Sequence, residues 1–152
     1  MTLFRVVVWA LHTMAMGGAL LVFVNGALAA DQPDLAPIVF VTPTTVQAGA
    51  AVTIVLKVDN RGAGAAPASQ VTIYLSKDAA KKSPDALVLR DKPLPPLGAG
   101  ASVQHDLVPT VIPASVAAGS YHLLFIVDEV NAVEESNEAN NHVAVPITVR
   151  PP

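Results

Sequence analysis

The sequence predicts an all-β fold in which two sheets pack face to face as a sandwich. Three observations support this prediction. Proline is frequent, with 13 in 152 residues, and it is spread through the chain, where each proline would break the interior of a helix. Short runs of alternating apolar and polar residues recur along the chain after residue 34. Glycine and proline turns separate these runs, which is typical of sandwiches and barrels.

The first 29 residues have the composition of a secretory signal peptide. Arg5 gives a positively charged start, residues 6–24 are almost wholly apolar, and Ala27 and Ala29 fit the small-x-small pattern of a cleavage site. We expect cleavage after Ala29, with Ala30 as the other choice. The apolar run is about 19 residues, long enough for an uncleaved membrane anchor, which is the alternative. The mature chain is expected in the periplasm or secreted, and at a membrane only if the N-terminal segment stays uncleaved.

The first three predicted strands occupy residues 35–41, 51–59 and 70–76. The first contains Pro37, and a proline inside a strand favours the edge of a sheet. In the second, the apolar residues recur with a period of two, which turns one face toward a core. That face carries Val52, Ile54, Leu56 and Val58. The third strand has the same period, and the turn at residues 60–64 separates the two.

The remaining predicted strands occupy residues 86–90, 102–112, 120–127 and 142–149. Residues 77–85 form a polar connection, and residues 93–100 are predicted to be a proline-rich loop. The fifth strand is expected to kink near Pro109. Tyr121 begins the sixth strand, where its hydroxyl could fix a corner of the fold or where it could be an ordinary half-buried residue. Seven short strands in one domain, residues 33–150, predict an immunoglobulin-like or fibronectin-III-like sandwich.

Composition excludes several classes of function. The chain has no cysteine, which removes disulfides, thiol catalysis, iron–sulfur clusters and cysteine zinc sites. The net charge is −3, and no basic stripe runs along the chain. The sequence therefore predicts no nucleic-acid partner.

Several segments, taken in this order, resemble a bacterial family of exported domains. They are residues 33–35, 49–62, 71–78, 97–103, 118–121 and 127–141, and the last is the most specific. Over residues 33–149 the chain is similar to the cell-adhesion-related domain found in bacteria, CARDB. The resemblance implies a seven-stranded sandwich in exported or surface proteins, with no catalytic activity. Members usually occur as repeats inside larger chains, whereas this sequence holds a single copy.

Residues 128–141, the acidic loop, concentrate the polar side chains of the sequence. The loop holds Asp128, four glutamates and four asparagines. Calcium takes about six to eight oxygen ligands from carboxylates, amides and carbonyls. We therefore hypothesise a calcium ion, the one cofactor considered, and the predicted ligands are Asp128, Glu135, Asn137 and Glu138. Their spacing does not fit the EF-hand loop.

The alternative for the acidic loop is structural. Asn and Asp side chains commonly satisfy backbone groups in turns and caps, and Asn tolerates left-handed geometry. A long connection between two strands has many such groups to satisfy. In this interpretation Val130 and Val133 pack under the loop and hold it against the sandwich.

Other polar residues give no catalytic pattern. His105, His122 and His142 each lie in a different predicted strand without metal-ligand spacing, and His105 is expected on a wet face. No serine stands in a Gly-x-Ser-x-Gly elbow. The basic stretch at residues 77–83 is interpreted as a solvated loop, with a membrane surface or an anionic glycan as the alternative. The sequence therefore predicts that the protein is not an enzyme.

Two functions remain. The first is a module that binds a protein or a glycan at the bacterial cell envelope through end loops or an exposed strand edge. The second is a structural spacer or subunit without a ligand of its own, with calcium as a stabilising ion. An exposed apolar or aromatic patch would favour the binding module.

Overall fold

The computed structural model describes residues 31–80 and 86–151, and this part of the chain is built almost wholly from β-strands. The strands are β1 (Leu35–Thr42), β2 (Thr45–Gln47), β3 (Ala51–Asn60), β4 (Ser69–Ser76), β5 (Leu87–Leu94), β6 (Ser102–Val111), β7 (Gly119–Val127) and β8 (His142–Arg150). A short 3-10 helix, η1 (Glu138–Asn140), precedes β8. The predicted signal peptide, residues 1–29, lies outside the described residues, as do residues 81–83 of the basic stretch. Within the described residues, no helix is long and apolar enough to cross a membrane.

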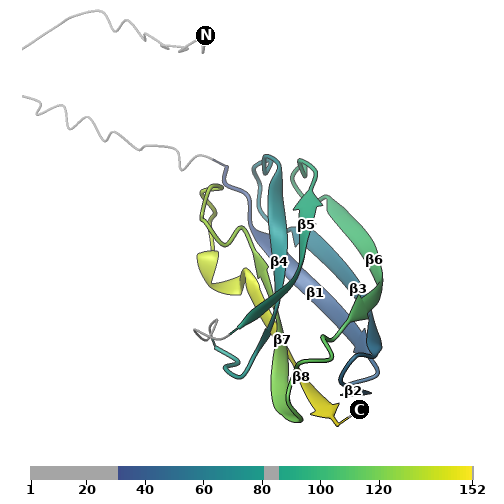
Figure 1. The fold of residues 1–152 in the computed structure, drawn as a ribbon. Helices are drawn as coiled ribbons and strands as arrows, with labels where there is room; N and C mark the ends of the chain where they lie inside the picture. The colour runs from purple at the N-terminus through teal and green to yellow at the C-terminus, as the bar shows by residue number, and fades with distance from the viewer. Residues whose placement is uncertain (1–30, 81–85, 152) are drawn as a thin grey trace, which may run out of the picture.

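Two sheets face each other, which confirms the predicted sandwich (Figure 1). One has the order β1-β3-β6 and the other the order β2-β8-β7-β4-β5. All pairs are antiparallel except β2 with β8. The predicted count of seven strands was one short, because the described chain has eight strands and an isolated bridge between Ala66 and Leu97. The missed strand, β2, is three residues long and too short to show a period.

Proline positions follow the sheet edges. β1 pairs with β3 alone, so Pro37 lies in an edge strand as predicted. β6 is the other edge of this sheet, and its register with β3 shifts where Val108 and Pro109 stand opposite the single residue Thr53. This bulge confirms the predicted kink near Pro109. The predicted loop at residues 93–100 begins two residues later than expected, because β5 continues through Leu94.

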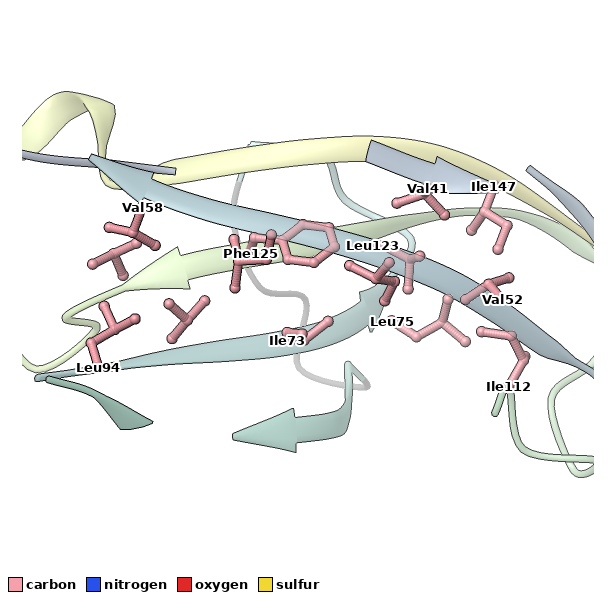
Figure 2. Packing of buried hydrophobic residues seen from close by; sticks show 14 of the residues in the cluster. Val41, Val52, Val58, Ile73, Leu75, Leu94, Ile112, Leu123, Phe125 and Ile147 are labelled. Atoms are coloured by element: carbon pink, nitrogen blue, oxygen red, sulfur yellow. The ribbon is translucent and has the colours of Figure 1, made fainter. Parts of the chain in front are cut away.

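The core lies between the two sheets and is formed by every second residue of the inner strands (Figure 2). Phe125 and Leu123 of β7 lie beside Ile73 and Leu75 of β4, and each of these side chains is buried. Burying a large apolar side chain contributes about 1.5–3 kcal/mol relative to leaving it exposed. The core therefore holds the two sheets together, and the polar side chains described below lie in the loops at the two ends of the sandwich.

The sandwich has an entry end and a far end, which differ in which strands begin and end there. The entry end is where β1 and β8 begin, and it contains residues 31–34, the turn at 60–64 and the acidic loop. The far end is where β1 and β8 end, and it contains residues 43–50 and 112–120. Figure 1 shows the described chain entering at one end of the sandwich and reaching its C-terminus at the other.

Candidate functional site

The acidic loop begins with a tight turn held by Asp128. Its backbone has a φ of 47°, in the left-handed region that Asp and Asn tolerate, and Asn131 follows with a φ of 49°. The Asn131 N–H donates to the Asp128 carbonyl at 2.8 Å, and the Val133 N–H donates to Asp128 Oδ2 at 2.7 Å. Asp128 is buried, so its carboxylate replaces water as the partner of the Val133 N–H.

Val133 packs into the core under this turn, as predicted, with 3% of its surface exposed. Val130 does not, and the prediction for it was wrong. Its side chain is 77% exposed, because it lies at the tip of the turn that Asp128 closes. One apolar anchor is therefore enough to seat the loop.

Glu135 connects the loop to the first strand. Its side chain is 7% exposed, and Oε2 accepts a hydrogen bond from the Leu35 N–H of β1. Oε1 accepts from Asn141 Nδ2 at 2.9 Å. Burial raises the pKa of the Glu135 carboxyl, and the charges of Glu138 and Asp128 act in the same direction, while the two hydrogen bonds oppose the rise. Glu135 is thus a buried acceptor for an edge-strand amide.

Glu138 and Asn137 satisfy the backbone of the loop itself. Glu138 Oε1 accepts from the Glu135 N–H at 3.0 Å, and its Oε2 accepts from Asn141 Nδ2, also at 3.0 Å. Asn137 is the N-cap of η1, and its Oδ1 accepts from the Ala139 N–H at 3.2 Å. The arrangement corresponds to the structural alternative for the loop.

Further bonds attach the loop to the segment that enters β1. The Ser136 N–H donates to the Pro33 carbonyl at 2.9 Å, and Asn140 Nδ2 donates to Asp34 Oδ1 at 2.7 Å. Together with the Glu135–Leu35 bond, they bring residues about a hundred positions apart in the chain into one network. The acidic loop therefore fixes where β1 begins.

Asn60 is the central residue that the sequence interpretation missed. It is 1% exposed, and its Oδ1 accepts from the Asp34 and Gly62 N–H groups, both at 3.1 Å. Its Nδ2 donates to the carbonyls of Gly64 at 2.8 Å and Leu97 at 3.0 Å. One buried side chain at the end of β3 thus joins the segment that enters β1 to two loops. Its place in the 49–62 segment was the available signal.

The four predicted calcium ligands lie near one another, but their oxygens face donors. Asp128 and Asn137 accept backbone N–H groups, and an amide nitrogen, Asn141 Nδ2, occupies the space between the Glu135 and Glu138 carboxylates. A cation in that space would meet an N–H donor at contact distance, so this arrangement of side chains does not fit the ion. Within residues 31–80 and 86–151 no group of three or more His, Asp or Glu side chains is close enough to hold a metal.

The structure keeps the three histidines apart. His122 and His142 lie on the outer face of one sheet, opposite Pro146 and Ile126 respectively, and are therefore roughly 13 Å apart along the strands. His105 lies in β6 of the other sheet, opposite the buried Leu56, so its ring turns toward the interior. The expected wet face for His105 was wrong. Burial lowers the pKa of His105, and the charge of Lys92 lowers it further.

The far end carries a small open cleft beside Tyr121. The Tyr121 hydroxyl donates to the Ala117 carbonyl at 3.1 Å, so the predicted corner is present on a half-buried tyrosine. The Lys77 ammonium lies 6.0 Å from the centre of the Tyr121 ring, at the outer limit of a cation–π contact. The cleft has a volume of about 180 Å³, and Leu75 and Val116 are the buried side chains of its lining.

Apolar side chains are also exposed on the edge strand β1. Phe40 is 63% exposed and Ile38 is 45% exposed, and both lie on the outer face of the three-stranded sheet. Their partners across β3 are Val55 and Lys57. The sequence did not predict that these two residues are exposed. They lie on the same face of an apolar strand, and a period of two does not show whether that face is buried or exposed.

Comparison with known proteins agrees with this geometry. The CARDB family model matches residues 32–145. A CARDB domain from Pyrococcus furiosus, solved in complex with di-metal ions, is 23% identical, with a TM-score of 0.57 over 78% of this chain and 90% of that one. A domain of a candidate cell surface protein from Methanosarcina acetivorans is 26% identical, with a TM-score of 0.55 over 78% of this chain and 93% of that one.

More distant likenesses show the fold alone. A β-glucosidase from Erythrobacter marinus contains a similar sandwich, with a TM-score of 0.52 and 14% identity over 78% of this chain but 16% of that enzyme. Comparison with curated protein sequences gives no significant match. Because the family model covers residues 32–145 and the sandwich is present in the described residues, the chain belongs to the CARDB family.

Proposed function

We propose that this protein is an exported, non-catalytic module that binds a protein partner at the bacterial cell envelope through β1. The observation that carries the proposal is the pair of exposed apolar side chains, Phe40 and Ile38, on an edge strand. Exposed apolar side chains that gather at one place mark contact surfaces more often than scattered ones do. An edge strand adds backbone groups that a partner strand can pair with.

The register shows which backbone groups of β1 face outward. The Asn60 N–H donates to Ala101, away from β1, so the Leu35–Asn60 pair exchanges no hydrogen bonds. By alternation, the N–H and carbonyl groups of Val39 and Val41 also point away from β3, toward the open edge. Pro37 falls in the same outward-facing set, where its missing N–H costs no bond in the sheet.

The outward-facing backbone groups of β1 and its exposed side chains could together bind an added strand from a partner. Phe40 lies between Val39 and Val41, so a segment that pairs with their backbone groups would also cover the Phe40 ring. Lys57 and Asp59 form an ion pair at 2.7 Å on the same face of the sheet. The expected partner is therefore an extended segment with an apolar side chain against Phe40 and polar neighbours.

Export is the second part of the proposal. It is supported by the signal-peptide composition of residues 1–29 and by the similar domain from a candidate cell surface protein. The absence of cysteine is compatible with any compartment and does not bear on this point.

A glycan is the second candidate ligand, and the Tyr121 cleft favours it. An aromatic ring beside an apolar floor and a cation suits a ring-shaped ligand that carries a negative group. A cavity of about 150 Å³ can hold a benzene-sized molecule, and this cleft is of similar size. The cleft lies at the far end and β1 crosses the whole sandwich, so the two surfaces can be tested separately.

The test is capture of envelope proteins by the immobilised chain and by two variants. We expect the double variant Ile38→Thr with Phe40→Thr to lose a partner that the unmodified protein retains. Val88→Thr is the matched control, since Val88 is 57% exposed on the edge strand β5 of the other sheet. Equal capture by all three proteins would exclude β1 as the contact surface. A blank for the unmodified protein would favour the spacer function.

Calcium binding by Asp128, Glu135, Asn137 and Glu138 stays a prediction. The di-metal complex of the Pyrococcus furiosus domain supports testing it, and the hydrogen bonds of the acidic loop argue against it. Calorimetric titration of the purified protein with calcium decides the matter, and absence of heat at millimolar ion would exclude the site.

A further inference from the structure

The described chain enters and leaves the sandwich along one line. Leu35 contacts Glu135, in the loop that leads into β8, and Arg150 is the last residue of β8. A nine-residue strand is roughly 27 Å long, so the two exits are separated by about the length of the domain. We propose that this domain is mechanically resistant to extension between residues 31 and 151, because a pull along this axis loads both β1 and β8 in shear. This inference goes beyond the binding function and does not depend on a ligand.

The ladder between β1 and β3 is the first element under load. It joins eight residue pairs, from Leu35 with Asn60 to Thr42 with Thr53. A pull on residue 31 away from the far end draws β1 along its own axis. Hydrogen bonds in an antiparallel ladder lie perpendicular to the strands, so this pull strains all of them at once. Several bonds must then fail together, which requires a higher force than breaking them one after another.

The last strand is loaded in the same way. β8 pairs with β7 over eight residues, from His142 with Ile126 to Val149 with Gly119. A pull on residue 151 draws β8 toward the far end, again along its axis. β7 is an interior strand of its sheet and is therefore held by β4 on its other side.

The parallel pair β2–β8 joins the two terminal segments directly. Three residues of β2 stand beside Thr148, Val149 and Arg150, and the Ala48 N–H donates to the Arg150 carbonyl at 3.0 Å. β2 follows β1 after two residues, so the opposed pulls slide β2 and β8 past each other. The load can thus pass between the first and last strands without first separating the two sheets.

The entry end prevents β1 from peeling. The Gly64 N–H donates to the Gln32 carbonyl at 3.0 Å, and a Cβ on Gly64 would come within 1.9 Å of the Asp31 oxygen. The acidic loop holds the same segment through the Pro33–Ser136 and Asp34–Asn140 bonds. In this proposal the loop is a clamp that keeps the load axis parallel to β1.

Single-molecule force spectroscopy tests the proposal, and the lack of native cysteine makes the load axis selectable. In the full chain, Asp31→Cys with Pro151→Cys applies the shear axis. Ala68→Cys with Pro95→Cys is the matched control, because both residues lie between the last β4–β5 pair, 69 with 94, and the isolated Ala66–Leu97 bridge. Pulling there loads the bridge and the first ladder pair, and it then opens the ladder one pair at a time. We expect a several-fold higher unfolding force on the shear axis at the same loading rate.

Clamp variants separate mechanical resistance from general stability. Glu135→Ala and the milder Asn140→Ala are expected to lower the unfolding force on the 31/151 axis. They should leave the force on the 68/95 axis unchanged. Equal forces on the two axes in the unmodified protein would overturn the proposal. Equal losses on both axes in the variants would overturn the clamp function of the loop.

Discussion

The two ends of the sandwich are closed in different ways. At the entry end, buried polar side chains such as Asn60, Asp128 and Glu135 satisfy the backbone of the loops. At the far end, the backbone mostly satisfies itself: the Gly49 N–H donates to Ile112 and the Ile112 N–H donates to Ala50, both at 2.9 Å. Where side chains satisfy the backbone groups of a loop, a particular residue is needed at each of those positions. The entry end should therefore be the more sensitive end to substitution, and the far end the more tolerant.

The largest expected effect is at Asn60. Asn60→Ala removes the acceptor of the Asp34 and Gly62 N–H groups and the side-chain donor to three carbonyls. The Leu97 and Gly98 carbonyls keep a backbone N–H donor, whereas the Gly64 carbonyl loses the Asn60 amide. Since a net hydrogen bond contributes about 1 kcal/mol and an orphaned buried group costs more, we expect a loss of about 3–4 kcal/mol in the free energy of unfolding. Urea denaturation measures it. Arg61→Ala, at the exposed next position, is the control and should change stability by less than about 0.5 kcal/mol.

The second-largest loss of stability is expected at Glu135. Glu135→Ala leaves the Leu35 N–H without its acceptor and the Asn141 amide with Glu138 alone. It also removes a carboxylate that two neighbouring carboxylates repel. The first effect destabilises and the second partly offsets it, so we expect a loss of about 2 kcal/mol. Glu134→Ala, an exposed neighbour, should be close to neutral. If both variants lose the same stability, the acidic loop does not act through Glu135.

This difference between the ends also explains what could be predicted from the sequence. The apolar alternation in β3, β4 and β7 gave strand boundaries within a residue or two, because burial of one face imposes a period of two. The entry end was found as a segment, since it requires Asp, Glu and Asn at fixed places. Asn60 was missed as the central residue, because a single Asn in a turn does not show which distant groups it will meet.

At the far end the backbone bonds carry no side-chain signature. β2 was missed because three residues are too few to show a period, and its pairing with β8 depends on where the chain crosses between the sheets. The exposed pair Ile38 and Phe40 was also hidden, because a period of two does not reveal which face of an edge strand is outside. Tyr121 is the exception, and it was recognised through the corner that sandwich domains use.

A moderate effect is expected at that corner. Tyr121→Phe keeps the ring and its packing but removes the hydroxyl that donates to Ala117. The bond is partly exposed, and water can replace it at the carbonyl, so we expect a loss of about 1 kcal/mol or less. Thermal unfolding followed by circular dichroism checks it. A loss as large as that at Asn60 would show that the far end also depends on one side chain, and would remove the contrast between the ends.

The smallest effect is the pH dependence of the entry end. Burial raises the pKa of Glu135 above its unfolded value, so the folded state binds a proton more tightly than the unfolded state. The contribution of this group to stability is therefore fully present below the unfolded pKa and is lost as pH rises through the folded pKa. Other carboxylates titrate in the same window, so the informative quantity is the stability of the unmodified protein minus that of Glu135→Gln, measured by urea denaturation from pH 7 to pH 4. We expect this difference to shift in favour of the unmodified protein as the pH falls. A shift in the opposite direction would mean that the Leu35 and Asn141 hydrogen bonds to the ionised carboxylate outweigh its burial.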